Sequence, residues 1–395
     1  MTSAPPSQRA TAAPNLLRFG LAAWLTLAST GALAEPSTHE RLASIAEAYV
    51  AAIADHDPLT ATALGLAGAD GRLVIPSEPA RAARIARLDR WKAEVEATMQ
   101  AAGSAIALVD ANDARLLRAE FDSQKNELVV RESDRKDYAG PALRLVDSLF
   151  APFLYLPIVG RDAARADDVD RAWDDIVSRL EQGPAFVVAG QRLVTRPGRL
   201  FGTVGSRRLE GAPEFIGGAL SEAAQAQLAG RPELLRRFAA GRDALLATLT
   251  ETRAHIDSRV ASWPDNHVIG KAAYERMLRE EQLLPFDSAD LERMGRDELA
   301  HGWSKEAWLT ALAHQKKIAF GAASGGGMAP DGPPLVGYYR DRIAELRAFV
   351  VAHDVVTVPD WLGAREIVET PAFLQPVSPG ASMRAPRRFA KSTTG

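Results

Sequence analysis

The stretch RPELLRRFAAGRDALLATLTETRAHIDSRVASWP, residues 231–264, decides the fold class of this chain. Its large apolar residues recur at helical intervals and so lie on or near one face of an α-helix: Leu235, Phe238, Leu245, Leu249, Ile256 and Val260. This is the longest helical candidate in the sequence. A helix with one apolar face needs other elements to cover that face, which favours a mainly α fold.

Helical patterns continue on both sides of this stretch. A capping box formed by Ser37 and Glu40 predicts a helix over about 38–54. Apolar faces with helical spacing follow at 85–99, 116–121 and 169–180, and helices are also expected over 270–285, 287–317 and 338–354. Residues 266–270 and 354–369 favour a few short β-strands. We therefore predict one multi-helix domain over residues 35–395.

Residues 1–34 have the pattern of a cleavable secretory signal. Arg9 and Arg18 precede an apolar run that ends at Leu27, and small residues follow up to Ala34. The apolar run is too short for a permanent membrane helix, which takes about 20 apolar residues, and no other stretch is long and apolar enough. We expect cleavage near Ala34, a periplasmic or secreted protein, and no stable membrane span after signal removal.

The composition excludes several classes of function. The chain has 47 Lys and Arg residues against 50 Asp and Glu residues, a formal net charge of −3. It therefore lacks the global positive field on which non-specific nucleic-acid binding depends, and nucleic acid is not expected as a partner. The absence of cysteine excludes disulfides, cysteine nucleophiles and cysteine-based zinc sites.

Motifs that carry chemistry are scarce. Neither G-x-S-x-G nor H-E-x-x-H occurs in the 395 residues. Glu298 and His301 stand three apart and would share one helical face, but a di-iron site needs a second such unit, and only this one is found. A solvated helix face is the simpler interpretation, with an independent metal enzyme built on this pair as the weakest hypothesis. No catalytic or metal-binding residue is assigned.

Two further groups of residues are typical of ordinary helices. The acidic pair Glu280 and Glu281 falls in a strongly charged stretch, so we expect it to be solvated. Trp303 and Trp308, with Leu312, are spaced as a helical apolar face, and we expect them to belong to the core.

Three ordered segments resemble a family of secreted and lipoprotein-type bacterial proteins known as domain of unknown function 885. The central segment, residues 269–299, holds the family's G-K-x-x-Y start, LL-P turn and L-x-x-x-G-x-x-E-L helix. The family's P-x-x-A-T-x-x-G opening matches residues 58–65, and its v-t-v-P and E-T-P-x-F strings match residues 356–359 and 369–373. The resemblance spans nearly the whole mature chain.

The resemblance implies a zincin-like metallopeptidase. Family members continue to a His-Glu-x-x-Pro-Gly-His motif, whose histidines would hold zinc and whose glutamate would act as base toward a zinc-bound water. This sequence lacks the motif, since its only His-Glu, at His39 and Glu40, is followed by Arg-Leu. The final residues 382–395, SMRAPRRFAKSTTG, resemble a family string that leads toward the motif. We therefore expect a domain that is incomplete at its C-terminus, zinc in full-length relatives, and no cofactor in this chain.

Two functions follow as hypotheses. The first is a secreted or periplasmic metallopeptidase-like protein, truncated and catalytically incompetent, so that its status as an enzyme stays open. The alternative is a non-enzymatic periplasmic protein that binds peptides or acts as a scaffold. Lys271 and Tyr274 are the candidates for substrate binding, because they begin a predicted helix directly after a predicted strand. A helix start with a packed tyrosine is the structural alternative for these two residues.

Overall fold

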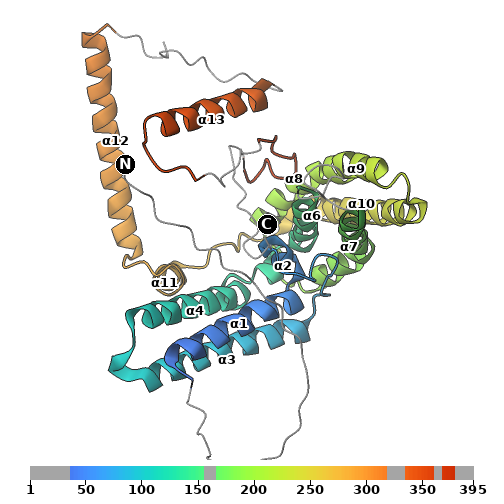
Figure 1. Ribbon diagram of the computed structural model, residues 1–395, viewed down its shortest axis with the longest axis horizontal. Coiled ribbons are helices and arrows are strands. Elements are labelled where there is room, and N and C mark those ends of the chain that lie inside the picture. Colours follow the sequence, from blue (N-terminus) through green and yellow to red (C-terminus); the bar gives the residue numbers. More distant parts are fainter. Residues whose placement is uncertain (1–35, 155–165, 318–333, 360–366, 379–395) are drawn as a thin grey trace, which may run out of the picture. The chain divides into compact units, whose positions relative to one another are not determined.

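The computed structural model describes residues 36–154, 166–317, 334–359 and 367–378. All regular elements within these ranges are helical, which confirms the predicted mainly α fold (Figure 1). The α-helices are α1 (Thr38–His56), α2 (Pro58–Leu64), α3 (Glu78–Ala102), α4 (Leu108–Asn126), α5 (Ser133–Lys136), α6 (Gly140–Leu154), α7 (Ala166–Arg192), α8 (Arg199–Pro213), α9 (Leu220–Gln227), α10 (Pro232–Arg259), α11 (Lys271–Arg276), α12 (Ser288–Gln315) and α13 (Pro334–Ala352). Shorter turns are the 3₁₀ helices η1 (Gly103–Ala105) and η4 (Val260–Ser262) and the π-helical turns η2 (Glu127–Arg131), η3 (Glu214–Ala219) and η5 (Met277–Glu281).

The predicted short β-strands are not confirmed. Residues 266–270, 357–359 and 367–370 have no regular secondary structure, and residues 360–366 lie outside the described part of the chain. A strand needs a partner strand to satisfy its backbone groups. Here the side-chain amide of Asn266 instead donates to the carbonyl of Arg196 at 2.8 Å. The segment 266–270 is therefore a loop that is held to the turn before α8 by single hydrogen bonds and not by strand pairing.

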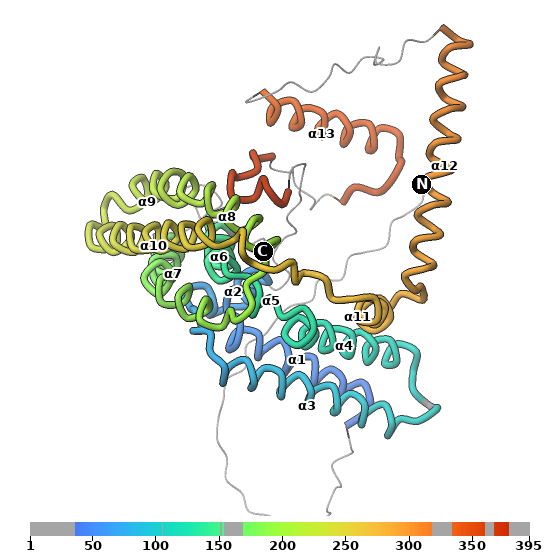
Figure 2. Tube along the Cα trace, turned by 180° about the vertical axis from the view of Figure 1, so that it is seen from behind, coloured from blue at the N-terminus to red at the C-terminus, as the bar shows by residue number. Residues whose placement is uncertain are grey.

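The largest core lies between α7 and α10, which run side by side in both views (Figures 1 and 2). Helix α10 buries most of the apolar face predicted for it, including Phe238, Leu245 and Ile256. The facing residues of α7 match the predicted pattern as well: Val169, Trp173, Ile176, Val177 and Leu180 are all buried. Helices α6 and α8 and the turn η3 add their own apolar residues to this core. Burial of this shared face is the main force that holds the four helices together.

A second core joins α1, α3 and α4. The rings of Tyr49, Trp91 and Phe121 pack against one another with centroid separations of 5.2–5.8 Å. The face predicted at 116–121 is only partly buried, because Phe121 is inside while Leu116 is 60% exposed. Leu116 lies on the α4 surface that lines a cavity next to α1.

A buried arginine explains why the P-x-x-A-T-x-x-G string matters to the fold. Arg179 of α7 has no exposed surface and donates hydrogen bonds to the Thr62 hydroxyl and to the carbonyls of Pro58 and Ala69. It also donates to the carbonyl of Ser148 in α6. These bonds satisfy a charge that would be costly to bury alone, and they fasten the short helix α2 to α6 and α7.

The carboxylate of Glu281 anchors the turn η5 to α4 and η2. From the sequence, this carboxylate was expected to be solvated. The Glu281 side chain is only 2% exposed, accepting a hydrogen bond from Asn126 at 2.8 Å and pairing with Arg131. For Glu281 the expectation was wrong because both partners lie about 150 residues earlier in the chain, whereas Glu280 is exposed as expected. Distant partners of this kind leave no signal in local periodicity.

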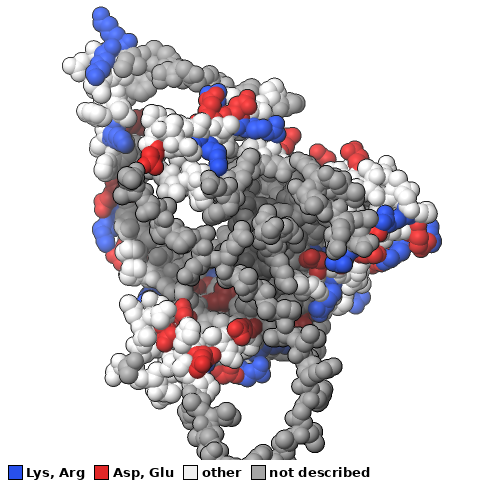
Figure 3. Space-filling view, viewed as in Figure 1, with Lys and Arg blue, Asp and Glu red and all other residues white. Residues whose placement is uncertain are grey.

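Helices α12 and α13 carry exposed apolar residues. Trp303 and Trp308 of α12 are 63% and 61% exposed, so the expectation that they belong to the core is wrong for the described structure. None of the described helices could cross a membrane. The predicted signal, residues 1–34, lies outside the described ranges. On the face shown in Figure 3, acidic and basic side chains are interspersed, as the small net charge leads one to expect.

Candidate functional site

A cavity of about 250 Å³ lies where the E-T-P-x-F segment packs against α6 and η3. Most of its lining is apolar and aromatic. The lining residues are Phe150, Phe153, Glu214, Phe215, Ala219, Val368, Glu369, Pro371 and Ala372. We refer to it as the aromatic cavity.

Phe373 fixes the E-T-P-x-F segment in place. Its side chain is fully buried, with ring centroids 5.5 Å from Phe150 and 5.7 Å from Phe215. Arg208 of α8 donates from Nε to the Phe373 carbonyl at 3.1 Å and from Nη2 to Asp147 at 2.9 Å. The residues before Phe373 are thereby held at the cavity wall.

Gly211 allows α8 to approach this segment closely. A Cβ atom at Gly211 would lie 2.5 Å from the carbonyl carbon of Ala372 and 2.5 Å from the nitrogen of Phe373. Real Cβ atoms do not come this near to backbone atoms, so the contact requires glycine. The wall of the cavity is therefore set by a backbone-to-backbone contact.

The π-helical turn η3 supplies another part of the cavity lining. A π turn places an extra residue in the helix and redirects the following side chains, and such turns are frequent at functional sites. Here η3 brings Glu214, Phe215 and Ala219 to the cavity. The buried hydroxyl of Ser221 donates to the carbonyl of Ile216 at 2.8 Å and so satisfies one of the turn's backbone acceptors.

Two carboxylates stand beside the apolar lining. Glu214 and Glu369 are both exposed, and no Lys or Arg of the described residues forms an ion pair with either. A ligand that fits would have an apolar group for the phenylalanine wall and a positive charge for the carboxylates. The sequence pointed to this segment only through Glu369 and its neighbours, because the other walls come from distant parts of the chain.

A second cavity, of about 540 Å³, lies between α1 and α4. Its lining combines an apolar floor with polar groups: His39, Leu42, Ala43, Ala46, Asp113, Leu116, Leu117 and Glu120. Glu120 is already engaged, since it accepts hydrogen bonds from the Tyr49 hydroxyl and from Gln124. Burial, together with the bond to Glu120, raises the pKa of Tyr49.

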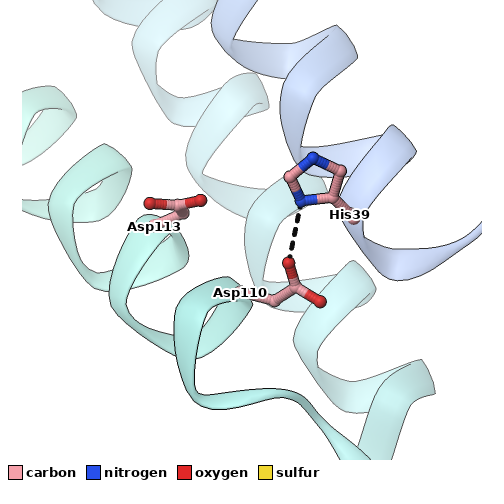
Figure 4. Close-up of side chains that lie close together, drawn as sticks. All are labelled: His39, Asp110 and Asp113. Atoms are coloured by element: carbon pink, nitrogen blue, oxygen red, sulfur yellow. Dashed lines mark hydrogen bonds and ion pairs between the residues drawn. The ribbon is translucent and has the colours of Figure 1, made fainter. Parts of the chain in front are cut away.

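His39, Asp110 and Asp113 converge at one end of this second cavity (Figure 4). His39 Nδ1 is 3.0 Å from Asp110 Oδ1, and one ligand atom from each of the three residues lies within 4.8 Å of the others. The sequence singles out His39 only as one of seven histidines and through the Glu40 that follows it. Asp110 is 71 residues away, so no local spacing could reveal the cluster.

The residues singled out from the sequence lie elsewhere. Lys271 has a side chain that is 73% exposed and approaches Glu275 at 3.7 Å, while Tyr274 is 37% exposed. Both belong to α11, and neither lines the aromatic cavity or the second cavity. Glu298 and His301 are exposed on α12, apart from the metal-ligand cluster found among the described residues.

A zinc site of the kind that the family resemblance implies does not fit the residues of this chain. That site needs two histidines and a glutamate within one motif, and the seven histidines of this sequence never occur in such an arrangement. Each of the seven lies within the described ranges, where only His39 is grouped with two carboxylates.

Comparison with known proteins places the chain in a family. The family model described as "Bacterial protein of unknown function (DUF885)" matches residues 58–395, whereas no curated protein matches. A solved structure described as a "putative lipoprotein of unknown function" from Shewanella oneidensis is similar, with a TM-score of 0.59 and 16% sequence identity. The match covers 85% of this chain and 65% of that one, and at such identity it shows the fold alone. Because the family model covers most of its length, the chain belongs to the bacterial family of unknown function DUF885.

Proposed function

We propose that this chain is a secreted or periplasmic metallopeptidase-like protein that binds peptides without hydrolysing them. The observation that carries the proposal is the aromatic cavity, which the E-T-P-x-F segment, residues 369–373, helps to build. Its volume of about 250 Å³ is below the range of pockets that enclose whole drug-sized ligands, so it suits one side chain of a longer ligand.

The lining selects the kind of peptide. Phe150, Phe153 and Phe215 offer a wall for an apolar side chain, and burying such a group contributes about 1.5–3 kcal/mol. Glu214 and Glu369 also line the cavity, and their carboxylates are acceptors for an ammonium group beside that side chain. A peptide whose first residue is apolar can contact both the phenylalanine wall and the carboxylates, because the free amino group of that residue is next to its apolar side chain. Such a peptide is the ligand we infer.

The absence of hydrolysis is a separate part of the proposal. It rests on the sequence, which contains no His-Glu-x-x-Pro-Gly-His and no H-E-x-x-H among its 395 residues. Zinc chemistry of the kind that the family resemblance implies therefore has no set of ligands here that matches the family motif.

Fluorescence anisotropy with labelled peptides tests the binding proposal. A peptide with a free N-terminal Leu or Phe should bind, and acetylation of its amino group should weaken binding by roughly tenfold, since a charge-assisted contact is lost. Glu214→Gln and Glu369→Gln should each reproduce that loss. Glu222→Gln, at an exposed position on α9 outside the cavity, is the matched control.

Several results would refute the proposal. Equal affinity for the free and acetylated peptides would show that the carboxylates do not bind the amino group. Wild-type affinity in Phe153→Ala would show that the peptide does not bind in the aromatic cavity. Mass spectrometry of the same incubations should show intact peptide, whereas cleavage would show that the chain is a hydrolase. Lys271→Ala and Tyr274→Phe test the sequence-based candidates, and a loss of affinity there would relocate the binding site to α11.

A further inference from the structure

The cluster of His39, Asp110 and Asp113 lies outside the aromatic cavity and shares no residue with it. His39 is in the first turn of α1, and the two aspartates are near the start of α4. Asp110 and Asp113 are three residues apart, so their side chains emerge from the same face of the helix. Packing of α1 on α4 around Leu42 and Phe121 brings that face to His39.

The cluster has too little positive charge for its carboxylates. The Asp110 side chain is only 11% exposed, and its partner is the imidazole of His39. The Asp113 side chain forms no hydrogen bond or ion pair with the described residues, and none of their Lys or Arg side chains pairs with Asp110. Even a protonated His39 would bring one positive charge against two negative ones. A buried carboxylate is costly unless it is paired, and a divalent cation would meet this need.

The distances suit such an ion. One ligand atom from each residue lies within 4.8 Å of the other two. At the tetrahedral angle, bonds of about 2.0–2.2 Å to a central ion place ligand atoms about 3.3–3.6 Å apart, so side-chain rotations that bring the atoms about 1 Å closer are enough. The His39 side chain is 65% exposed and can make this adjustment.

The neighbouring cavity provides the remaining space. His39 and Asp113 line it, and its volume of about 540 Å³ leaves room for water or a ligand atom to complete the coordination. Glu120 also lines it but is held by Tyr49 and Gln124, which leaves the three clustered residues as the ligands.

We propose that His39, Asp110 and Asp113 bind one divalent transition-metal ion, with zinc as the best match, and that this ion joins the start of α1 to the start of α4. An imidazole with two carboxylates suits zinc or manganese better than calcium or magnesium, which prefer oxygen ligands alone. The site differs from the family motif, because it uses one histidine and residues far apart in the sequence.

The test uses the full chain, treated with a chelator and titrated with zinc chloride by isothermal titration calorimetry in a non-coordinating buffer. The expected result is one zinc ion per chain, with affinity reduced by at least about tenfold in His39→Ala and in Asp113→Asn. His267→Ala and Asp297→Asn, at exposed positions outside the cluster, are the matched controls and should bind as the wild type does. Zinc should raise the Tm of the wild type and leave the Tm of His39→Ala unchanged.

Circular dichroism of the metal-free variants checks that they fold, and both substitutions are at positions where the side chain is not fully buried. Manganese binding with the same dependence on His39 and Asp113 would also support the site. The proposal would be overturned if zinc affinity were the same in the wild type and both variants. Binding of calcium or magnesium alone would overturn the assignment to a transition metal.

Discussion

At the residue scale, Asp137 is a carboxylate whose surroundings make folding depend on pH. Its Oδ1 accepts hydrogen bonds from the backbone N–H groups of Ala139 and Gly140 at 3.1 and 2.9 Å, next to the start of α6. Burial nevertheless raises the pKa of Asp137 to about 6 in the folded state. The folded chain therefore holds this proton more tightly than the unfolded chain, where the ordinary value is 3.8.

The direction in which pH changes the unfolding free energy follows from this difference in the pKa of Asp137. The stabilising contribution of protonated Asp137 is complete below pH 3.8 and is lost as the pH rises through about 6. Asp137→Asn cannot ionise and keeps an acceptor oxygen. Relative to this variant, the wild type should lose at most about 3 kcal/mol of unfolding free energy between pH 4 and pH 7. Urea denaturation of both proteins at several pH values measures the difference, and parallel curves would contradict the prediction.

Single residues also show which features local sequence patterns can predict and which they cannot. The buried residues of α7 could be predicted, because an amphipathic helix repeats with a fixed period and its apolar face has to be covered. The burial of Glu281 could not be predicted, because its partner Arg131 is distant in the sequence and comes near only in the folded chain. The same holds for His39, whose aspartate neighbours come from another helix.

At the scale of elements, the contact between α8 and the E-T-P-x-F segment controls the shape of the aromatic cavity. In Gly211→Ala the new methyl group would meet backbone atoms of Ala372 and Phe373, neither of which can rotate away. We expect a loss of about 1–3 kcal/mol in unfolding free energy, as for other overpacked sites, and weaker peptide binding. Urea denaturation and the peptide titration measure the two effects.

Gly218→Ala is the matched control for this substitution. Gly218 lies in the neighbouring turn η3, and a Cβ there would have no atom within 4 Å outside its own helix. Its stability and peptide affinity should be close to those of the wild type. If Gly211→Ala behaved like this control, the close contact would not define the cavity.

Elements differ in how well the sequence predicts them. The long helices α7, α10 and α12 follow from periodicity, which depends only on neighbours within a few turns. The π-helical turns do not, because an extra residue in a turn is stabilised by tertiary contacts such as the Glu281 anchor of η5. The aromatic cavity depends on one of these turns, so its position was also beyond sequence reasoning.

At the scale of the whole molecule, exposed apolar side chains on α12 and α13 should govern association. The large apolar residues that are more than 50% exposed there are Leu299, Trp303, Trp308, Leu346, Phe349 and Val351. Exposed apolar surface of this extent promotes association, and a net charge of −3 gives little electrostatic repulsion to oppose it. The chain should therefore form larger species as its concentration rises.

Replacing Trp303 and Trp308 together by Glu tests this expectation. Because both side chains are more than 60% exposed, the double variant should keep the stability of the wild type. It should also remain monomeric at concentrations where the wild type associates, since it loses apolar surface and gains two negative charges. Lys305→Glu changes the charge of the same helix by a similar amount without removing apolar surface, and it should associate nearly as the wild type does. Light scattering coupled to size-exclusion chromatography measures the mass of each protein, and a wild type that stays monomeric at every concentration would show that these side chains do not drive association.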